Sequence, residues 1–266
     1  KDIPVITTLH GTDITLVGRD KTYEPVVTFS INQSDAITAV SENLRQETLN
    51  HFKIVKPIEV IHNFVDTARF RRKPIDAFRQ VLAPKGEKIL VHASNFRKIK
   101  RVQDVVRIFA AVRAEVPSKL LFIGDGPERS TAEELSRELG VFDCVRFVGK
   151  QDQIEDILSI ADLFLLTSEY ESFGLAALEA MAAGVPVIST EAGGLGEVNI
   201  DGKTGFTCAV GDVAGMSAHA IELLQDDQLL QQFREGARMQ AASFDISNIL
   251  PIYETLYQKV VEAYRS

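Results

Sequence analysis

Two glutamates with seven residues between them stand in the middle of the chain. Glu171 and Glu179 bracket the stretch Ser-Phe-Gly-Leu-Ala-Ala-Leu. Eight helical steps of 1.5 Å would separate the two carboxyl groups by about 12 Å, whereas the paired carboxyl groups of a glycoside hydrolase stand roughly 5–9.5 Å apart. The spacing therefore predicts contacts with the two ends of one long ligand, such as a sugar joined to a nucleoside through a diphosphate.

The residues between the two glutamates predict an anion site. An apolar strand is expected over residues 163–166, and a helix is expected from Gly174 onward. The backbone N–H groups of Phe173, Gly174 and Leu175 would then lie at a helix N-terminus, where no group within the helix accepts from them. Open parallel sheets bind ligands at the carboxyl ends of their strands. We therefore expect the diphosphate to lie over these three amides.

A basic turn forms the second cluster of chemically useful residues. The run Ala-Ser-Asn-Phe-Arg-Lys-Ile-Lys-Arg over residues 93–101 places four cations between an expected strand and an expected helix. Cations here can hold a diphosphate whose negative charge grows as a glycosidic bond breaks. The sequence has no Asp-x-Asp pair, so we expect no metal at the leaving group and no other cofactor.

A third cluster lies near the beginning of the chain. His10 follows a strand expected over residues 5–9, with Thr8 and Thr12 on either side of it. Asn43 and Arg45 fall in the first turn of the helix after the next strand, where N-terminal amides attract anions. Adjacent parallel strands would bring these residues together, which favours a second ligand site in this half of the chain.

The elements that position these residues alternate between short β-branched runs and amphipathic stretches, which is typical of α/β proteins with parallel sheets. After residue 88 the alternation is regular enough for a complete doubly wound, Rossmann-like domain. Strands are expected over 89–92, 120–123, 145–148, 163–166, 187–189 and 205–208, and helices over 102–116, 128–139, 154–160, 174–183, 213–224, 228–242 and 246–264.

The first part of the chain has fewer elements. Strands are expected over 5–9, 36–40 and 59–61, and helices over 25–33 and 41–52. We interpret residues 1–62 as the second half of an N-terminal Rossmann-like domain whose first half is absent from this chain. Residues 63–75 are the expected linker and 76–245 the expected ligand-binding domain, and the helix over 246–266 is placed to cross back to the N-terminal domain.

Composition excludes several classes of function. The chain has 29 Lys and Arg against 37 Asp and Glu, a net charge of −8, which disfavours nonspecific binding to nucleic acid or anionic lipid. It has no apolar run of membrane-spanning length and no secretory signal pattern at its start. Two distant cysteines, Cys144 and Cys208, suggest neither a disulfide framework nor a zinc site. We therefore expect a cytoplasmic protein without nucleic-acid or membrane partners.

Taken together, these motifs resemble a known family. The glutamate pair with its turn is similar to the E-x7-E signature of the retaining glycosyltransferases of family 4, which have the two-domain GT-B fold. The run Ile-His-Asn-Phe-Val-Asp over residues 61–66 resembles the interdomain segment of that family, and Phe-Ile-Gly-Asp-Gly-Pro over 122–127 resembles one of its strand turns. The resemblance covers nearly the whole chain and implies a metal-independent retaining transfer from a UDP-sugar.

The resemblance also implies roles for individual residues. Lys100 matches the phosphate-binding lysine of the family and His10 matches its His-Gly motif, which implies that His10 orients sugar or acceptor hydroxyls. Glu179 would bind the ribose hydroxyls and Glu171 the transferred sugar. Backbone near Gln151 would face the uracil.

One position departs from the family pattern. Asn95 stands where the family usually has an arginine. The sequence therefore leaves open whether Asn95, Arg97 or Arg101 completes the diphosphate clamp with Lys100.

The residues of these motifs most closely resemble those of a family member that uses UDP-N-acetylglucosamine as donor and L-malate as acceptor in bacillithiol biosynthesis. If this closer resemblance holds, Thr8, Thr12, Asn43 and Arg45 are the expected malate-binding residues, because two carboxylates require hydroxyl, amide and cationic partners. A sugar-nucleotide epimerase, a transferase with another acceptor and a noncatalytic nucleotide-sugar-binding module remain alternatives. The oligomeric state stays open, a homo-oligomer included.

Overall fold

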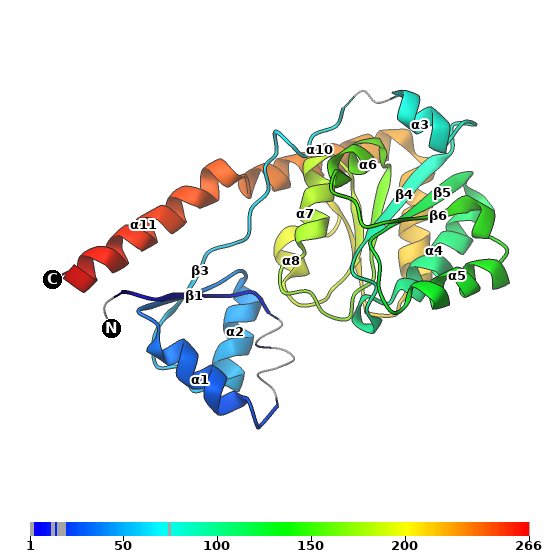
Figure 1. Ribbon diagram of the computed structural model, residues 1–266. Coiled ribbons are helices and arrows are strands. Elements are labelled where there is room, and N and C mark those ends of the chain that lie inside the picture. Colours follow the sequence, from blue (N-terminus) through cyan, green and yellow to red (C-terminus); the bar gives the residue numbers. More distant parts are fainter. Residues whose placement is uncertain (1–2, 12–13, 15–19, 74–75, 266) are drawn as a thin grey trace.

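The chain forms two parallel β-sheets with helices packed against them (Figure 1). The computed structural model describes residues 3–11, 14, 20–73 and 76–265. The smaller sheet has the order β1 (Ile6–Leu9), β2 (Ala36–Ala39) and β3 (Ile58–Val60), and the larger sheet has six strands. The α/β class and the two separate parallel sheets expected from the sequence are confirmed.

Two helices follow the strands of the smaller sheet. Helix α1 (Glu24–Gln33) connects β1 to β2, and helix α2 (Glu42–His51) connects β2 to β3. Helix α2 begins after Ser41 because the Ser41 hydroxyl oxygen accepts a hydrogen bond from the Leu44 N–H at 3.1 Å. This cap fixes the first turn of α2, which carries Asn43 and Arg45.

The larger sheet has the strand order β6-β5-β4-β7-β8-β9. The chain runs from β4 to β5 on one side and from β7 to β8 on the other. The loops that leave the neighbouring strands β4 and β7 therefore run in opposite directions. Such a switch point opens a crevice at the carboxyl edge of the sheet, where ligands bind. The strands are β4 (Lys88–Ala93), β5 (Ser118–Ile123), β6 (Val145–Gly149), β7 (Leu163–Leu166), β8 (Val187–Thr190) and β9 (Gly205–Cys208).

Helices cover both faces of the larger sheet. Successive residues of β4 join different cores, since Ile89 and Val91 pack on one face and Leu90 on the other. Helices α4, α5 and α9 cover the Leu90 face, and α6 and α7 cover the opposite one. The bounds are α4 (Val102–Glu115), α5 (Arg129–Glu138), α6 (Ile154–Ile160), α7 (Leu175–Ala182), α9 (Val213–Gln225) and α10 (Asp227–Ser243).

Four short elements that the structure describes were not expected from the sequence. They are α3 (Asp76–Leu82), α8 (Leu195–Val198) and two 3₁₀ turns, Lys98–Lys100 and Phe142–Cys144. Each has at most two helical turns, which is too short to display a hydrophobic period. Tertiary contacts therefore decide whether these segments become helical.

The linker and the last helix connect the two halves. The Val65 N–H donates to the Phe244 carbonyl at 3.0 Å, and the Ile246 N–H donates to the Val65 carbonyl at 2.9 Å. These bonds tie the linker to the junction between α10 and α11 (Ile246–Arg265). The boundaries expected at residues 62, 75 and 245 remain predictions.

Helix α11 packs against the smaller sheet, away from the larger one (Figure 1). Ile249 and Leu256 are buried together with Ile61. The Tyr253 hydroxyl also donates to the Ile61 carbonyl at 3.3 Å. No helix among the described residues is long and apolar enough to span a membrane.

Candidate functional site

The turn between β7 and α7 lies at the switch point of the larger sheet. Gly174 precedes α7 with a φ of 95°, and a Cβ atom built there would lie 2.4 Å from Leu195 Cδ2, so only glycine fits. The N–H groups of Phe173, Gly174 and Leu175 donate to no other described residue. The Phe173 ring is buried, so this residue can offer a ligand only its backbone.

Lys100 and Glu171 meet across the switch point. Lys100 comes from the loop after β4 and Glu171 from the loop after β7, and Lys100 Nζ lies 2.5 Å from Glu171 Oε1. The Ser168 hydroxyl donates to the same oxygen at 2.7 Å. The side chains of Lys100 and Glu171 are 19% and 15% exposed. A partly buried cation and carboxylate thus stand together where an anion and a sugar would both be in reach.

Backbone contacts hold these two loops in place. The Glu169 N–H donates to the Ile99 carbonyl at 2.8 Å, and the Thr167 hydroxyl donates to the Lys100 carbonyl at 2.8 Å. On the other side of the turn, the Gly194 N–H donates to the Glu171 carbonyl at 2.8 Å. The Lys100 and Glu171 backbones are therefore fixed before any ligand binds.

Glu179 lies in the last part of α7 with its carboxyl group half-buried. Burial raises its pKa to about 7, and the charge of Glu155 adds to this rise while Arg69 opposes it. Arg69 is itself paired with Glu155 at 3.1 Å. No hydrogen bond to the Glu179 carboxyl group is formed within the described part of the chain. The group is thus an acceptor that a ligand with hydroxyl donors would satisfy.

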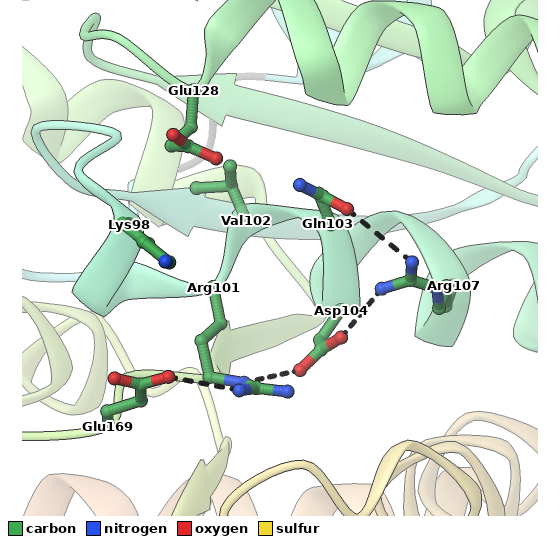
Figure 2. Close-up of a pocket in the computed structure, with 8 residues that line it drawn as sticks. All are labelled: Lys98, Arg101, Val102, Gln103, Asp104, Arg107, Glu128 and Glu169. Carbon is green, nitrogen blue, oxygen red and sulfur yellow. Dashed lines mark hydrogen bonds and ion pairs between the residues drawn. The ribbon is translucent and has the colours of Figure 1, made fainter.

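Arg101 is already engaged by acidic neighbours (Figure 2). Its guanidinium group lies 2.6 Å from Asp104 and 3.0 Å from Glu169. Asp104 also accepts from Arg107 at 2.9 Å. These bonds keep the pKa of Arg101 above its usual value. Of the three clamp candidates, Arg101 therefore has the least freedom to turn toward a phosphate.

The other two clamp candidates are exposed. Asn95 and Arg97 lie in the turn before Lys100, and neither side chain bonds to another described residue. A Cβ atom at Gly126 would lie 2.0 Å from the Asn95 carbonyl oxygen, so the loop after β5 supports this turn at very close range. The structure thus brings Asn95, Arg97 and Lys100 into one turn at the edge of the crevice.

Gln151 lies just past β6, which is separated from β7 in the sheet by the two strands β5 and β4. Its side-chain amide donates to the Val148 carbonyl at 2.6 Å. Gly149 has a φ of 71°, and its carbonyl accepts from the Gly124 N–H at 2.8 Å. Gln151 is therefore at the carboxyl edge of the sheet, on the same side of the switch point as the basic turn that follows β4.

The loop after β1 reaches the donor side. His10 is exposed, and the next residue, Gly11, has a φ of 122°. A Cβ atom at Gly11 would lie 2.6 Å from Ser172 Cβ. The His10 loop of the smaller half thus lies directly against the turn between Glu171 and Phe173.

The expected acceptor residues gather at the edge of the smaller sheet, with one exception. Thr8 pairs with Thr38 across β1 and β2, and its hydroxyl oxygen accepts from the Thr38 hydroxyl at 2.9 Å. Arg45 forms an ion pair with Glu42 at 2.6 Å. Asn43 Oδ1 is buried without a hydrogen-bond partner. Thr12, the fourth expected residue, lies outside the described residues.

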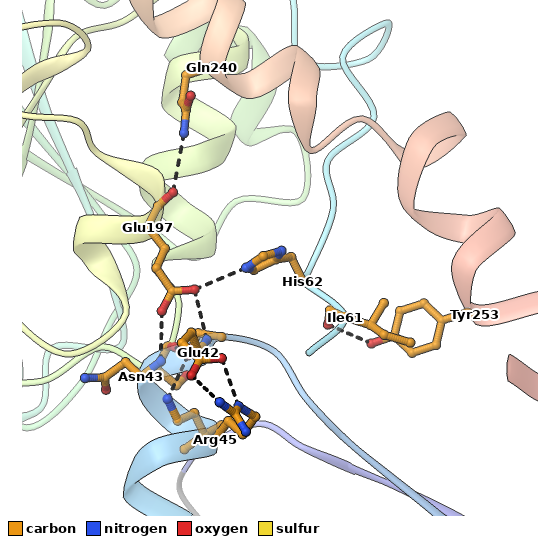
Figure 3. A network of polar contacts seen from close by, with 11 residues as sticks. Glu42, Asn43, Arg45, Ile61, His62, Glu197, Gln240 and Tyr253 are labelled. Atoms are coloured by element: carbon orange, nitrogen blue, oxygen red, sulfur yellow. Dashed lines mark hydrogen bonds and ion pairs between the residues drawn. The ribbon is translucent and has the colours of Figure 1, made fainter. Parts of the chain in front are cut away.

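An internal carboxylate occupies the N-terminus of α2 (Figure 3). The two oxygens of Glu197, from α8, accept from the N–H groups of Glu42 and Asn43 at 2.9 Å each. His62 Nε2 lies 3.1 Å from the same carboxylate, and these bonds hold the pKa of Glu197 below its usual value against the effect of burial. The α2 amides that we expected to attract an acceptor anion therefore already hold one of the chain's own carboxylates.

Glu197 and His62 were missed by sequence reasoning. Glu197 follows the Gly-Gly-Leu-Gly turn within a four-residue helix, and its partners lie more than 130 positions earlier. No local period marks such a residue. Within the described ranges, no group of three or more His, Cys, Asp or Glu side chains is placed to hold a metal ion.

Comparison with protein families matches both halves of the chain. Residues 75–240 match the model described as glycosyl transferases group 1, and residues 1–69 match glycosyltransferase family 4. The N-acetyl-alpha-D-glucosaminyl L-malate synthase of Bacillus anthracis is 46% identical over 261 residues, which are 97% of this chain and 68% of that protein. The chain spans between about half and two thirds of the curated relatives that it matches.

Solved glycosyltransferase structures have the same fold. Sucrose-phosphate synthase from Thermosynechococcus elongatus has a TM-score of 0.86 at 24% identity, over 97% of this chain and 68% of the other. Anabaena HepE in complex with UDP-glucose has a TM-score of 0.85 at 23% identity, over 96% of this chain and 72% of the other. The expected GT-B fold with an incomplete N-terminal domain is confirmed.

Proposed function

The chain belongs to the group 1 glycosyl transferases, and from that premise we propose that it forms the donor site and part of the acceptor site of an enzyme that transfers N-acetylglucosamine from UDP-N-acetylglucosamine to L-malate. The observation that carries the proposal is the contact between Lys100 and Glu171 beside the amides that begin α7. The 46% identical relative, whose name includes L-malate synthase, supports this donor and acceptor.

The donor is held along the crevice of the larger sheet. The ribose hydroxyls donate to the half-buried Glu179 carboxylate, and the uracil lies against the backbone near Gln151. The diphosphate accepts from the amides of Phe173, Gly174 and Leu175 and from Lys100. Glu171 accepts from hydroxyls of the transferred sugar. HepE, a protein of the same fold, was solved with UDP-glucose, which supports a nucleotide sugar as the ligand.

The reaction proceeds with retention of configuration and without a protein nucleophile. The bond between the anomeric carbon and the diphosphate breaks, and the acceptor hydroxyl oxygen bonds to the same face of that carbon. The leaving phosphate takes the proton of this hydroxyl. Lys100 and the α7 amides stabilise the charge that develops on the diphosphate, a role that a metal ion has in other transferases. Either Asn95 or Arg97 completes the clamp.

The acceptor lies across the interdomain cleft. Malate is held by Thr8 and Thr12 from the first strand and loop, and by Asn43 and Arg45 from α2. To bind one malate carboxylate, Arg45 must leave its ion pair with Glu42. The buried Asn43 oxygen has no partner and can accept from the malate hydroxyl. His10 lies between the two substrates and orients their hydroxyls. Contact between the halves also excludes water, which would hydrolyse the donor.

The full-length enzyme provides the test. It is incubated with UDP-N-acetylglucosamine and a panel of L-malate, other hydroxy acids and inositol phosphate, with EDTA present, and the products are identified by mass spectrometry and NMR. We expect an α-linked N-acetylglucosaminyl malate. Transfer only to another acceptor would disprove the malate assignment, a new sugar nucleotide formed from the donor alone would indicate an epimerase, and activity that requires an added divalent metal would disprove the role given to Lys100.

A further inference from the structure

A histidine is buried directly beneath the switch point, and the proposed reaction does not use it. His92 lies in β4 with no exposed surface. Its ring packs against the rings of Phe96 and Phe122, at centroid distances of 6.2 and 5.5 Å. Burial lowers its pKa to about 4, so the imidazole is neutral at physiological pH. A neutral polar ring in an apolar core needs partners for both of its nitrogens.

The first partner lies on the neighbouring strand. β4 and β7 pair through Leu90 with Leu163 and through Val91 with Phe164, and the ladder ends there. The next residues along the two strands are His92 and Leu165. His92 Nδ1 lies 2.8 Å from the Leu165 carbonyl oxygen. Because a carbonyl oxygen only accepts, Nδ1 carries the proton, and this side-chain bond continues the connection between the strands where the backbone ladder has stopped.

The second partner lies in the basic turn. His92 Nε2, which has no proton in this tautomer, accepts from the Ser94 hydroxyl at 2.8 Å. The Ser94 oxygen in turn accepts from the Phe96 N–H at 3.2 Å. Phe96 has a φ of 40°, a left-handed conformation that non-glycine residues rarely adopt without support. The chain of bonds therefore stabilises the backbone bend that leads into Arg97 and the 3₁₀ turn.

These two bonds lie between the loops that carry the proposed diphosphate and sugar ligands. The loop after β4 supplies Lys100 and the loop after β7 supplies Glu171, and the two strands separate above His92. We propose that His92 is a positioning residue, whose imidazole fixes the spacing of the parting strands and the bend at Phe96 so that Lys100 and Glu171 meet at the donor. The effect on catalysis rests on the proposed function. The chain of hydrogen bonds through His92 does not depend on it.

Two substitutions separate the bonds from the packing. His92→Phe keeps an aromatic ring between Phe96 and Phe122 and removes both hydrogen bonds, whereas Ser94→Ala removes only the branch to the turn. Misplacement of reacting groups by about 1 Å can cost 10²-fold in rate. We expect His92→Phe to lower kcat by about 10- to 100-fold while UDP affinity changes less than about threefold, because the α7 amides and Glu179 stay in place.

A double variant and a packing control complete the kinetic test. If both residues act through one chain of bonds, the His92→Phe, Ser94→Ala double variant loses no more activity than His92→Phe alone. Leu223→Ala serves as the control, since Leu223 lies in α9 and is buried in the same core as His92's neighbours Phe96 and Phe122. It should lower the thermal stability without changing kcat. A His92→Phe enzyme with wild-type kcat, or a fall in kcat that Leu223→Ala reproduces, would overturn the proposal.

A spectroscopic readout is independent of the acceptor. In the full-length protein labelled with ¹⁵N-histidine, His92 should show the Nδ1–H tautomer and no titration between pH 5 and 8, and Ser94→Ala should shift its Nε2 resonance. An Nε2–H tautomer or titration near neutral pH would disprove the bond pattern even in an active enzyme. If wild-type enzyme ignores malate, the proposed function fails, whereas the tautomer still decides the inference about His92.

Discussion

Among single residues, Glu179 has the most informative ionisation. Its pKa of about 7 belongs to the ligand-free protein and results from burial. In the proposed complex, ribose hydroxyls donate to the ionised form, so binding of the donor should lower this pKa. The affinity should therefore be full above pH 7 and weaken as the pH falls below 7, by about tenfold at pH 6.

Calorimetry with UDP-N-acetylglucosamine between pH 6 and 8 measures this dependence, because its diphosphate has no terminal phosphate group that titrates in the range. The control is Glu179→Gln, which cannot ionise. It should bind the donor more weakly, by about 1–3 kcal/mol at pH 8, and with no pH dependence. A wild-type affinity that is constant from pH 6 to 8 would remove Glu179 from the ribose role.

Lys100 should contribute more to the rate than to binding. If Lys100 binds the diphosphate as proposed, its attraction strengthens as the leaving group gains charge, so Lys100→Ala should lower kcat by about 10²-fold or more with a smaller loss of UDP affinity. Lys98→Ala removes the same charge two residues away and should retain most of the activity, since the Lys98 side chain is exposed and forms no hydrogen bond or ion pair with another described residue. Steady-state kinetics of the two variants would reveal equal losses if only the general positive charge of the turn matters.

The sequence alone identifies some of these residues and misses others. Glu171, Glu179 and Lys100 stand out in the sequence because they lie in local motifs, and the roles assigned to them remain predictions. The contact between Lys100 and Glu171 could not be predicted, because it depends on two loops that meet above the sheet. His92 reads as an ordinary member of an apolar strand, and only its position at the end of the β4 and β7 ladder shows a role.

At the level of elements, α8 should protect the first turn of α2. The Glu42 and Asn43 amides donate to Glu197, whereas the Leu44 amide donates to Ser41. Glu197→Ala should therefore accelerate hydrogen exchange at the first two amides by about tenfold or more and leave the Leu44 amide nearly unchanged.

NMR-detected exchange in the full-length protein resolves these three amides. Glu191→Ala, at an exposed glutamate shortly before α8, is the matched control and should leave all three protected. Equal acceleration at all three amides in Glu197→Ala would mean that the whole helix has loosened, and unchanged exchange would mean that the contact contributes no protection.

The larger elements followed from the sequence almost residue by residue, whereas the shortest did not. The six strands of the larger sheet are apolar runs bounded by polar turns, so their positions could be predicted. Helix α8 has only four residues, and it forms where Gly193 and Gly194 pass so close to Glu171 and Ser172 that no side chain fits. That approach is a property of the packed molecule and leaves no period in the sequence.

Across the whole molecule, α11 should determine the stability of the smaller half. Leu256 is buried between α11 and the smaller sheet, so Leu256→Ala should destabilise this half by about 2–4 kcal/mol through the cavity that it leaves. The core on the Leu90 face of the larger sheet contains no residue of the smaller half and should be unaffected. Thermal unfolding followed by hydrogen exchange would show the earlier loss of protection in β1–β3. The solvent-exposed Tyr257→Ala is the control, and a uniform loss across both halves would contradict a separate role for α11.

The position of α11 also constrains the order in which the polypeptide can be assembled during translation. Ile61 and Ile249 share one cluster although about 190 residues separate them in the chain. At 5–20 residues per second, the ribosome needs roughly 10–40 s to make the intervening residues. During that interval the strands β1–β3 have emerged without the helix that packs against them, while the core on the Leu90 face of the larger sheet, which contains no residue of β1–β3, can form without α11. The face of β1–β3 that α11 contacts is thus buried only after residues 246–265 have been made, and in a nascent chain this face would need protection for that interval.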